Sequence, residues 1–314
     1  MTITVVGHLC IDENHFPSET EKPRGDSGTF GGIFHSIATL AQVMSSTDTI
    51  HPVLGVGDGE HEAFLKRLEA FPNVDTSGIF RFKGETNRVL IFHEKDNSHR
   101  IECSKHISDP IPFNKIKQYL DADAILVNMV SGSDITLETL DRIRMAVRDT
   151  RTPIHFDFHS LTLGIDRDNR RFRRPLTDWR RWCFMINSVQ LSEEESAGLT
   201  AERFDERTLT NHLMSLMVNA LVITRGEKGV SAVLQENKKL THHDFERHVF
   251  GPAVDTAGCG DVFGAAFLYF YLLKKDYHLA TEFANRIAGL KATIPGIDGL
   301  GAALKKLEQP TVEG

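Results

Sequence analysis

The apolar and polar positions of the chain alternate between strand-like runs and helix-like periodicity. Residues Thr2 to Gly7 form a β-branched run that ends in glycine, which predicts a first buried strand. Gly31 and Gly32 then open a stretch whose apolar residues recur at helical spacing. The N-terminal part of the chain therefore predicts a strand–loop–helix unit.

The alternation is regular from about Asp121 onward. The pattern predicts strands at 124–128, 154–157, 184–191 and 221–224, and helices at 135–148, 205–217 and 260–272. Strands that alternate with helices in this way are typical of a parallel, doubly wound α/β sheet.

Residues 80–104 have a different pattern. Two β-rich runs, 89–93 and 100–102, flank the polar turn 96–98 like a hairpin. With residues 13–29, this segment predicts a small β-sheet lid over the edge of the main sheet. Because no repeat, low-complexity tract or flexible linker interrupts the chain, we expect residues 1–314 to form a single domain.

Composition indicates a globular protein, since 40% of the 314 residues are hydrophobic and 25% are charged. A net charge of −7 argues against nucleic acid as a partner. The first residues lack the features of a signal peptide and no long apolar run follows, so we expect no membrane association and a cytoplasmic location. The cysteines are too far apart to predict a disulfide framework or a zinc site: Cys10, Cys103, Cys183 and Cys259.

The chain has one strongly basic cluster, between Arg167 and Arg181, with aromatic residues interleaved. It is either a patch for an anion or a partner, or a solvated loop that leads into the next strand. Charge runs usually solvate a surface, which favours the loop.

Polar residues follow several predicted strands. Asp12, Asp157, the residues after Leu191, and Thr224 all lie at strand ends. Because ligands of such sheets bind beyond the carboxyl ends of the strands, we expect these residues to converge on one crevice.

A glycine-rich segment, Asp255-Thr256-Ala257-Gly258-Cys259-Gly260-Asp261, precedes an apolar helical run. Glycines allow successive N–H groups to face one concavity, and a helix N-terminus adds positive partial charge, so the segment suits an anion such as a phosphoryl group. Asp261 would accept a proton from a substrate hydroxyl beside that anion. The alternative is an ordinary turn in which Asp261 only caps the helix.

This segment resembles the D-T-x-G-x-G-D signature of the ribokinase-like (PfkB) carbohydrate kinases. Further segments resemble motifs of that family along most of the chain: Gly7 to Asp12, Gly31-Gly32, Gly55 to Asp58, residues 73–79, Thr224 to Gly229 as a T-x-G-x-x-G nucleotide loop, and Asn285. Several ordered matches are far more specific than a single motif.

The resemblance implies a Rossmann-like, mostly parallel sheet flanked by helices with a β lid, and transfer of the γ-phosphoryl group of ATP to a hydroxymethyl group in the presence of Mg²⁺. It also implies roles for individual residues. Asp261 would be the base and the backbone of Ala257, Gly258, Cys259 and Gly260 the anion hole; Asp12, Gly31, Gly32 and Ser36 would bind the acceptor; Thr224, Gly226, Gly229, Asp255 and Asn285 would bind ATP. The thiol of Cys259 is expected to be structural, since only its backbone N–H is needed.

The family's N-x-x-E element, whose glutamate acts on magnesium through water, has two possible registers. Ser192 to Glu195 places Glu195 at the acidic position, and Asn187 to Gln190 places a neutral amide there. An amide is a poorer partner for a hydrated dication, which favours Glu195. Ser192 and Glu195 also match a capping box, so a structural role is the alternative.

Two other departures concern the acceptor. Ser36 stands where the family commonly has an asparagine, and Asp157 to Leu161 replaces its D-x-N-x-R element. His159 in that segment is a candidate site residue, with ordinary hydrogen-bonded structure as the alternative. Asp12 is either a turn former or a ligand for two adjacent hydroxyls, and the resemblance favours the second.

Three functions remain in competition: a sugar or polyol kinase, a nucleoside kinase, and a non-catalytic ligand-binding relative. The intact Asp261 with its glycines weighs against the third. The sequence leaves open the identity of the acceptor, activation by a monovalent cation, and a homodimer formed through the lid.

Overall fold

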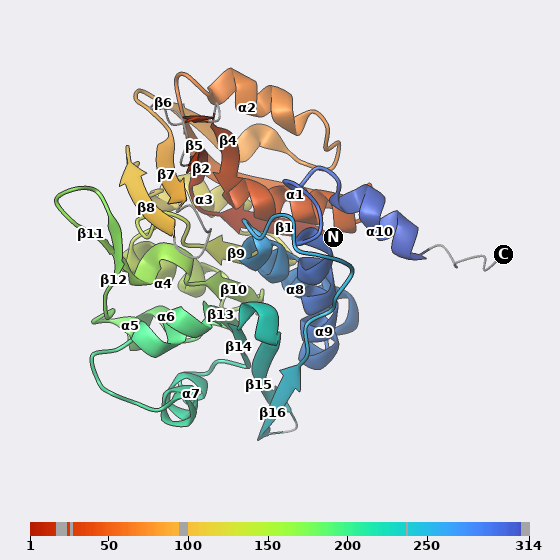
Figure 1. The fold of residues 1–314 in the computed structure, drawn as a ribbon. Helices are drawn as coiled ribbons and strands as arrows, with labels where there is room; N and C mark the ends of the chain where they lie inside the picture. Colours follow the sequence, from red (N-terminus) through yellow and green to blue (C-terminus); the bar gives the residue numbers. More distant parts are fainter. Residues whose placement is uncertain (17–23, 26–27, 94–99, 237, 309–314) are drawn as a thin grey trace.

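A large sheet forms the centre of the molecule in a computed structural model, which describes residues 1–16, 24–25, 28–93, 100–236 and 238–308 (Figure 1). Its strands within this part of the chain are β1 (Thr2–Val6), β5 (Thr49–Gly57), β6 (Ile79–Phe82), β9 (Ala124–Asn128), β10 (Ile154–Asp157), β13 (Ser188–Ser192), β14 (Ala220–Thr224), β15 (Val230–Glu236) and β16 (Lys239–Phe245). They lie in the order β16-β15-β14-β13-β10-β9-β1-β5-β6. The seven strands from β14 to β6 pair in parallel, and β15 and β16 form an antiparallel edge.

Helices cover both faces of this sheet. The described helices are α1 (Ile33–Val43), α2 (His61–Leu68), α3 (Phe113–Ile116), α4 (Leu137–Ala146), α5 (Trp179–Cys183), α6 (Glu193–Gly198), α7 (Glu206–Met214), α8 (Cys259–Lys274), α9 (Tyr277–Lys291) and α10 (Leu300–Glu308). Short 3₁₀ turns are η1 (Thr76–Gly78), η2 (Lys117–Tyr119), η3 (His159–Thr162) and η4 (Gly226–Lys228).

The alternation of side chains along the central strands divides the core into two layers. Ala124 and Leu126 of β9 pack with α1, α8 and α9, whereas Ile125 and Val127 pack with α4, α5 and α7. Successive residues of a strand point to opposite faces, so a run that is apolar at every position must be covered on both sides. The doubly wound fold expected from the sequence is confirmed.

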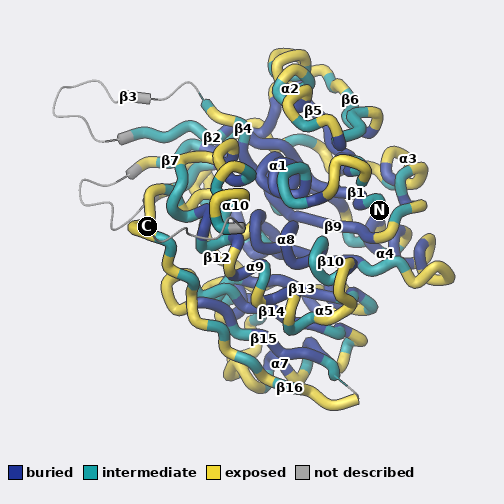
Figure 2. The backbone as a smooth tube through the Cα atoms, turned by 90° about the vertical axis from the view of Figure 1, so that its right-hand side faces the viewer, coloured by how far each residue is buried: buried dark blue, intermediate teal, exposed yellow. Residues whose placement is uncertain are grey.

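A second, smaller sheet forms the lid. It contains β2 (Leu9–Phe16), β3 (Arg24–Gly25), β4 (Thr29–Gly32), β7 (Asn87–His93) and β8 (Arg100–Lys105). β7 and β8 pair antiparallel as the expected hairpin, and β2 pairs parallel with β7. Figure 2 shows β2 and β7 extending from one side of the molecule. The turn at 94–99 and residues 17–23 and 26–27 lie outside the described residues.

The boundaries of the lid differ from those expected. β2 already belongs to it from Leu9, and residues 79–82 form β6, which pairs with β5 of the main sheet. Because β6 completes the edge of the large sheet, the second lid segment begins only at Asn87.

Two further segments differ from the sequence prediction. The strand expected at 184–191 begins at Ser188, because α5 ends at Cys183 and Met185 takes a positive φ of 58° that breaks the extended backbone. The basic cluster forms a hairpin, β11 (Leu163–Ile165) with β12 (Arg171–Arg173), followed by α5. Among the described helices, none combines the length and apolar character that crossing a bilayer requires.

Candidate active site

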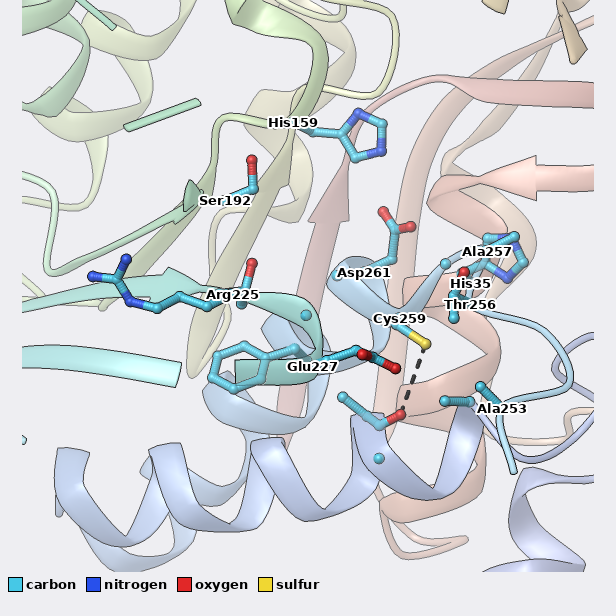
Figure 3. A pocket seen from close by; sticks show the side chains of 18 of the residues that line it. His35, His159, Ser192, Arg225, Glu227, Ala253, Thr256, Ala257, Cys259 and Asp261 are labelled. Carbon is cyan, nitrogen blue, oxygen red and sulfur yellow. Dashed lines mark hydrogen bonds between the residues drawn. The ribbon is translucent and has the colours of Figure 1, made fainter. Parts of the chain in front are cut away.

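A cavity of about 960 Å³ opens at the carboxyl ends of the parallel strands, beneath the lid (Figure 3). Most of the residues that the sequence singled out line it: Asp12, Gly32, Glu195, Thr224, Gly226, Gly229, Ala257, Gly258, Cys259, Gly260, Asp261 and Asn285. Gly31, Ser36 and Asp255 lie immediately behind this lining rather than in it.

Asp261 lies in the first turn of α8, and only 4% of its surface is exposed. The side-chain N–H of Asn128, at the end of β9, donates to Oδ1 of Asp261 over 2.5 Å. Burial raises the pKa of Asp261 to about 7, the charge of Asp12 adds to the rise, and the bond from Asn128 opposes it. Figure 3 shows the carboxylate pointing into the cavity. A carboxylate with a pKa near neutrality is suited to take up a proton.

Ser36 supports Asp261 from behind. Its hydroxyl donates to the backbone oxygen of Asp261 over 3.4 Å, and Asn128 donates to the Ser36 hydroxyl over the same distance. Ser36 is fully buried, so the structure places it outside the surface that an acceptor would contact.

The glycine-rich loop begins α8 with Gly258 in the left-handed region, at φ 75°. The N–H of Ala257 donates to the Asp255 carboxylate over 2.9 Å, and the N–H of Cys259 donates to the backbone oxygen of Thr256 over 3.3 Å. Within the part of the chain that the structure describes, the N–H groups of Gly258 and Gly260 have no acceptor. These two are therefore the donors of the loop that an anion would bind most readily.

Position 258 also has no space for a side chain, because the ring of His35 packs against it. A Cβ at this position would lie 2.5 Å from Cγ of the His35 ring, so the ring packs directly against the loop backbone. Burial lowers the pKa of His35 to about 4, and the ring is neutral at pH 7. Sequence reasoning missed His35, although it lies within the segment that follows Gly31 and Gly32.

Asp12 lines the cavity from strand β2 of the lid. Its carboxylate lies against the backbone of Gly31, where a Cβ would collide with it, and accepts a hydrogen bond from the Cys10 thiol over 3.3 Å. A side chain at Gly31 would displace this carboxylate. The glycine at position 31 therefore leaves the space that the Asp12 carboxylate occupies.

His159 also lines the cavity, at the start of η3 and with an unusual positive φ of 37°. Its Nδ1 lies 2.9 Å from the Ser160 hydroxyl, and burial lowers its pKa to about 4. Its backbone N–H donates to the buried carboxylate of Asp157 over 3.2 Å. His159 thus has both a structural partner and a place in the lining.

Two arginines of the basic cluster point toward the cavity from β12. Arg171 donates to Ser104 over 2.7 Å and to Glu102 over 3.3 Å, both on lid strand β8. Arg173 donates to Glu195 over 3.5 Å. The interpretation of this cluster as a solvated loop does not hold for Arg171, because its bonds to β8 connect the hairpin to the lid. Arg173 is exposed and pairs with Glu194 and Glu195 at the start of α6.

Ser192 and Glu195 form a complete capping box at the start of α6. The Ser192 N–H donates to Glu195 Oε2 over 2.8 Å, and the Glu195 N–H donates to the Ser192 hydroxyl over 3.2 Å. Glu195 nevertheless lines the cavity with 8% of its surface exposed, and burial raises its pKa. It therefore has a structural bond at one oxygen and faces Arg173 with the other.

The alternative register of the N-x-x-E element, from Asn187 to Gln190, is disfavoured by where its two end residues lie. Asn187 lies before β13, at the amino end of the strand, where its side chain accepts the N–H of Ile154. Gln190 lies inside β13 and donates to the backbone oxygen of Gly260 over 2.9 Å and to Asp157 over 3.2 Å. Gln190 is thus a support for the glycine-rich loop that the sequence did not reveal.

The described residues contain no group of three or more His, Cys, Asp and Glu side chains arranged to hold a metal ion directly. A single carboxylate at the cavity wall, such as Glu195, suits a magnesium ion that keeps its water shell. The residues at the cavity wall therefore fit a magnesium ion that Glu195 would contact through water, without direct protein ligands.

Another part of the cavity wall is formed by β14, η4 and α9. Thr224 ends β14, and Gly226 and Gly229 take positive φ angles of 55° and 87° in the turn that follows. Asn285 on α9 donates to the backbone oxygen of Glu246 over 2.7 Å, which fastens the segment after β16 to the helix.

Comparison with known proteins relates the sequence and the fold of this chain to one family. The sequence model of the pfkB family carbohydrate kinases matches residues 170–299. A pyrophosphate-dependent kinase of the ribokinase family, complexed with a pyrophosphate analog and myo-inositol, superimposes with a TM-score of 0.77 at 16% identity, covering 97% of this chain and 99% of that one. Ribokinase of Arabidopsis thaliana, complexed with ribose and ATP, superimposes with a TM-score of 0.72 at 19% identity, covering 98% of each chain.

Curated relatives are more distant in sequence. The bifunctional protein HldE of Geotalea uraniireducens (strain Rf4) is 24% identical over 248 residues, which cover 75% of this chain and 46% of the relative. An uncharacterized sugar kinase of Archaeoglobus fulgidus is 23% identical over 233 residues, covering 74% of this chain and 87% of the relative. The chain thus spans less than half the length of the HldE protein. The resemblance to the ribokinase-like (PfkB) carbohydrate kinase family is confirmed, and the fold is ribokinase-like.

Proposed function

We propose that this protein transfers the γ-phosphoryl group of ATP to a hydroxymethyl group of a sugar or sugar-like polyol. The observation that carries the proposal is Asp261, a buried carboxylate with a pKa raised to about 7, beside the glycine-rich start of α8. Base and anion site lie within a single turn of chain, so a hydroxyl held by Asp261 would lie beside a phosphoryl group bound at the start of α8.

In this mechanism Asp261 takes the proton of the acceptor hydroxyl while the oxygen of that hydroxyl bonds to the γ-phosphorus. The bond between that phosphorus and the β–γ bridging oxygen breaks, and ADP leaves with this oxygen. The N–H groups of Gly258 and Gly260 face the charge that develops on the transferring group, with the positive end of the α8 dipole behind them.

The acceptor is held at the lid side by Asp12, whose carboxylate accepts hydrogen bonds from adjacent hydroxyls. The nucleotide lies toward Thr224, Gly226 and Asn285, which also line the cavity. Asp255, behind the loop, contributes by holding Ala257 rather than by contacting ATP. Magnesium would neutralise phosphate charge, with Glu195 the residue that holds its water shell.

A substrate screen tests the proposal. Purified protein is incubated with Mg²⁺ and either ATP or pyrophosphate as donor, against sugars, sugar phosphates, inositols and nucleosides, and products are identified by mass spectrometry. We expect a phosphorylated sugar or polyol, with ADP formed above the acceptor-free background and lost in Asp261→Asn. Phosphorylation of nucleosides alone would contradict the acceptor class. Release of no product from any pair would favour a non-catalytic ligand-binding protein.

A further inference from the structure

Lys291, in the last turn of α9, is completely buried. Lysine is rarely found in this state, because removing an ammonium group from water is costly unless the charge is paired and hydrogen-bonded. Such a side chain in the core needs a specific partner. It is also a buried charge for which neither the sequence motifs nor the mechanism above has a role.

The partner of Lys291 is Asp255, the first residue of the glycine-rich loop. Nζ donates to the backbone oxygen of Asp255 over 2.9 Å and to its Oδ2 over 3.1 Å. The same carboxylate accepts the N–H of Ala257 at Oδ1 and the N–H of Gly296 at Oδ2, each over 2.9 Å. One ion pair therefore fixes the beginning of the loop and the turn that follows α9.

The loop rests on the C-terminal end of α9. The backbone oxygen of Ala292 accepts the N–H groups of Val254 and Asp255 over 2.7 and 3.1 Å. One turn earlier on α9, the backbone oxygen of Ala288 lies 3.7 Å from the Cys259 thiol, a contact drawn in Figure 3. Helix α9 thus contacts both ends of the segment from Asp255 to Cys259, and Lys291 supplies its charged contact with Asp255.

Two sources of negative charge lie behind the N–H groups that would face a phosphoryl anion. One is the C-terminal end of the α9 dipole. The other is Asp255: burial acts to raise its pKa, but the Ala257 N–H and the charge of Lys291 outweigh burial, and the pKa is lowered. Without a compensating cation, both sources would repel the anion that the loop has to bind.

We propose that Lys291 is a positioning residue that serves as a built-in cation: it holds the Asp255–Asp261 loop in its anion-binding geometry and offsets the negative charge behind it, in place of a monovalent metal ion. The effect on catalysis rests on the function proposed above. The cation site itself is independent of catalysis and can be measured without a substrate.

The test compares wild type with Lys291→Ala, which removes the ammonium group and opens space at its position. Melting temperatures are measured without substrates in K⁺, NH₄⁺ or propylammonium, against tetramethylammonium at the same ionic strength. We expect wild type to melt at one temperature in all four salts. Lys291→Ala should melt roughly 5 °C lower in tetramethylammonium and recover, saturably, with at least one of the small cations.

The same salts are then used in the phosphotransfer assay. Wild-type kcat/KM should not depend on the cation, whereas Lys291→Ala should lose on the order of 10- to 100-fold and regain part of it with the cation that restores the melting temperature. Lys291→Gln, which keeps hydrogen-bond donors but no charge, should behave like Lys291→Ala and replaces it if that variant does not fold.

Arg144→Met is the matched control. Arg144 is also a buried cation, paired with Asp141 over 2.6 Å and outside the lining of the cavity. Its loss should lower the melting temperature without any cation-specific recovery and without a change in kcat/KM.

Specific outcomes would overturn the proposal. These are saturable activation or stabilisation of wild type by K⁺, failure of every small cation to restore the Lys291 variants, or recovery of melting temperature without recovery of kcat/KM. If wild type transfers no phosphoryl group from any donor, the proposed function fails, and the melting temperatures still decide whether Lys291 occupies a cation site.

Discussion

Replacing Asp261 by asparagine should make this protein more stable and almost inactive at pH 8. The carboxylate is 4% exposed, and burial together with the charge of Asp12 raises its pKa from 3.8 to about 7. Asparagine has nearly the same size and keeps an oxygen that can accept the N–H of Asn128, now 2.5 Å from Oδ1. The substitution therefore removes the charge and leaves the packing nearly unchanged.

The magnitude follows from the shift of about 3 pKa units, which at 1.36 kcal/mol per unit corresponds to about 4 kcal/mol. Below about pH 3 the carboxyl group is protonated in both the folded and the unfolded chain, so the substitution should change little there. Between about pH 4 and pH 7 the unfolded chain loses this proton first, and the wild type loses stability as the pH rises. Asp261→Asn should escape this loss and be more stable by up to about 4 kcal/mol above pH 7.

Asp261→Asn should lower the catalytic rate although it raises stability. Loss of a general base typically lowers the rate by roughly 10²–10⁴-fold, and this loss should appear in kcat with little change in either KM. For wild type, kcat/KM should rise with pH and level off above about pH 7, as Asp261 loses its proton. The residual activity of Asp261→Asn should lack this transition.

Urea unfolding at several pH values between 4.5 and 8.5, with a coupled ADP assay on the same samples, measures both effects. Asp205→Asn is a control of opposite sign, because Asp205 caps α7 and its bond with Thr208 lowers its pKa. It should gain no stability at pH 8. The reasoning is refuted if folded Asp261→Asn turns over an accepted substrate at a rate comparable to wild type, or if its stability relative to wild type does not increase with pH.

The remaining predictions concern the other parts of the site. Asp12→Ala should raise the acceptor KM by a factor that corresponds to about 1.5–3 kcal/mol and leave ATP binding nearly intact, since Asp12 lies on lid strand β2 and not on the elements proposed to hold the nucleotide; an unchanged acceptor KM would remove it from the site. Glu195→Gln should shift the magnesium dependence to higher concentration, while Glu194→Gln, at an exposed position, should not, and equal shifts would contradict a specific role for Glu195. Cys259→Ala should keep most activity, because burial raises the pKa of this thiol to about 11 and leaves it protonated; activity at the level of a blank would instead indicate a thiol mechanism.

Local patterns in the sequence were sufficient for the main elements. The strands at 124–128 and 154–157 have the bounds expected, because a run that is apolar at nearly every position in a parallel sheet is buried on both faces. The glycine-rich segment begins a helix as expected, since glycine at 258 permits the left-handed turn that precedes it. Both features depend on neighbouring residues alone.

Segments of mixed composition could not be assigned in the same way. The run between Arg167 and Arg181 is basic throughout, yet Arg171 reaches Ser104 on the lid and is largely buried, while Arg180 pairs with Glu202 at the surface. A charge run has no periodicity that distinguishes an arginine that will be buried from one that will be exposed. Arg171 is buried because β8 packs against β12 in the folded chain, and this contact cannot be read from the local sequence.

The residues that hold Asp261 and Asp255 in place were determined by the tertiary structure. Asn128 lies 133 positions from Asp261, and Lys291 lies 36 positions from Asp255, so no local motif relates the members of either pair. The sequence by itself determined that a carboxylate stands at the start of α8 after a glycine-rich loop. The folded chain determined its proton affinity, because burial beneath the lid, the charge of Asp12 and the bond from Asn128 exist only when distant segments meet.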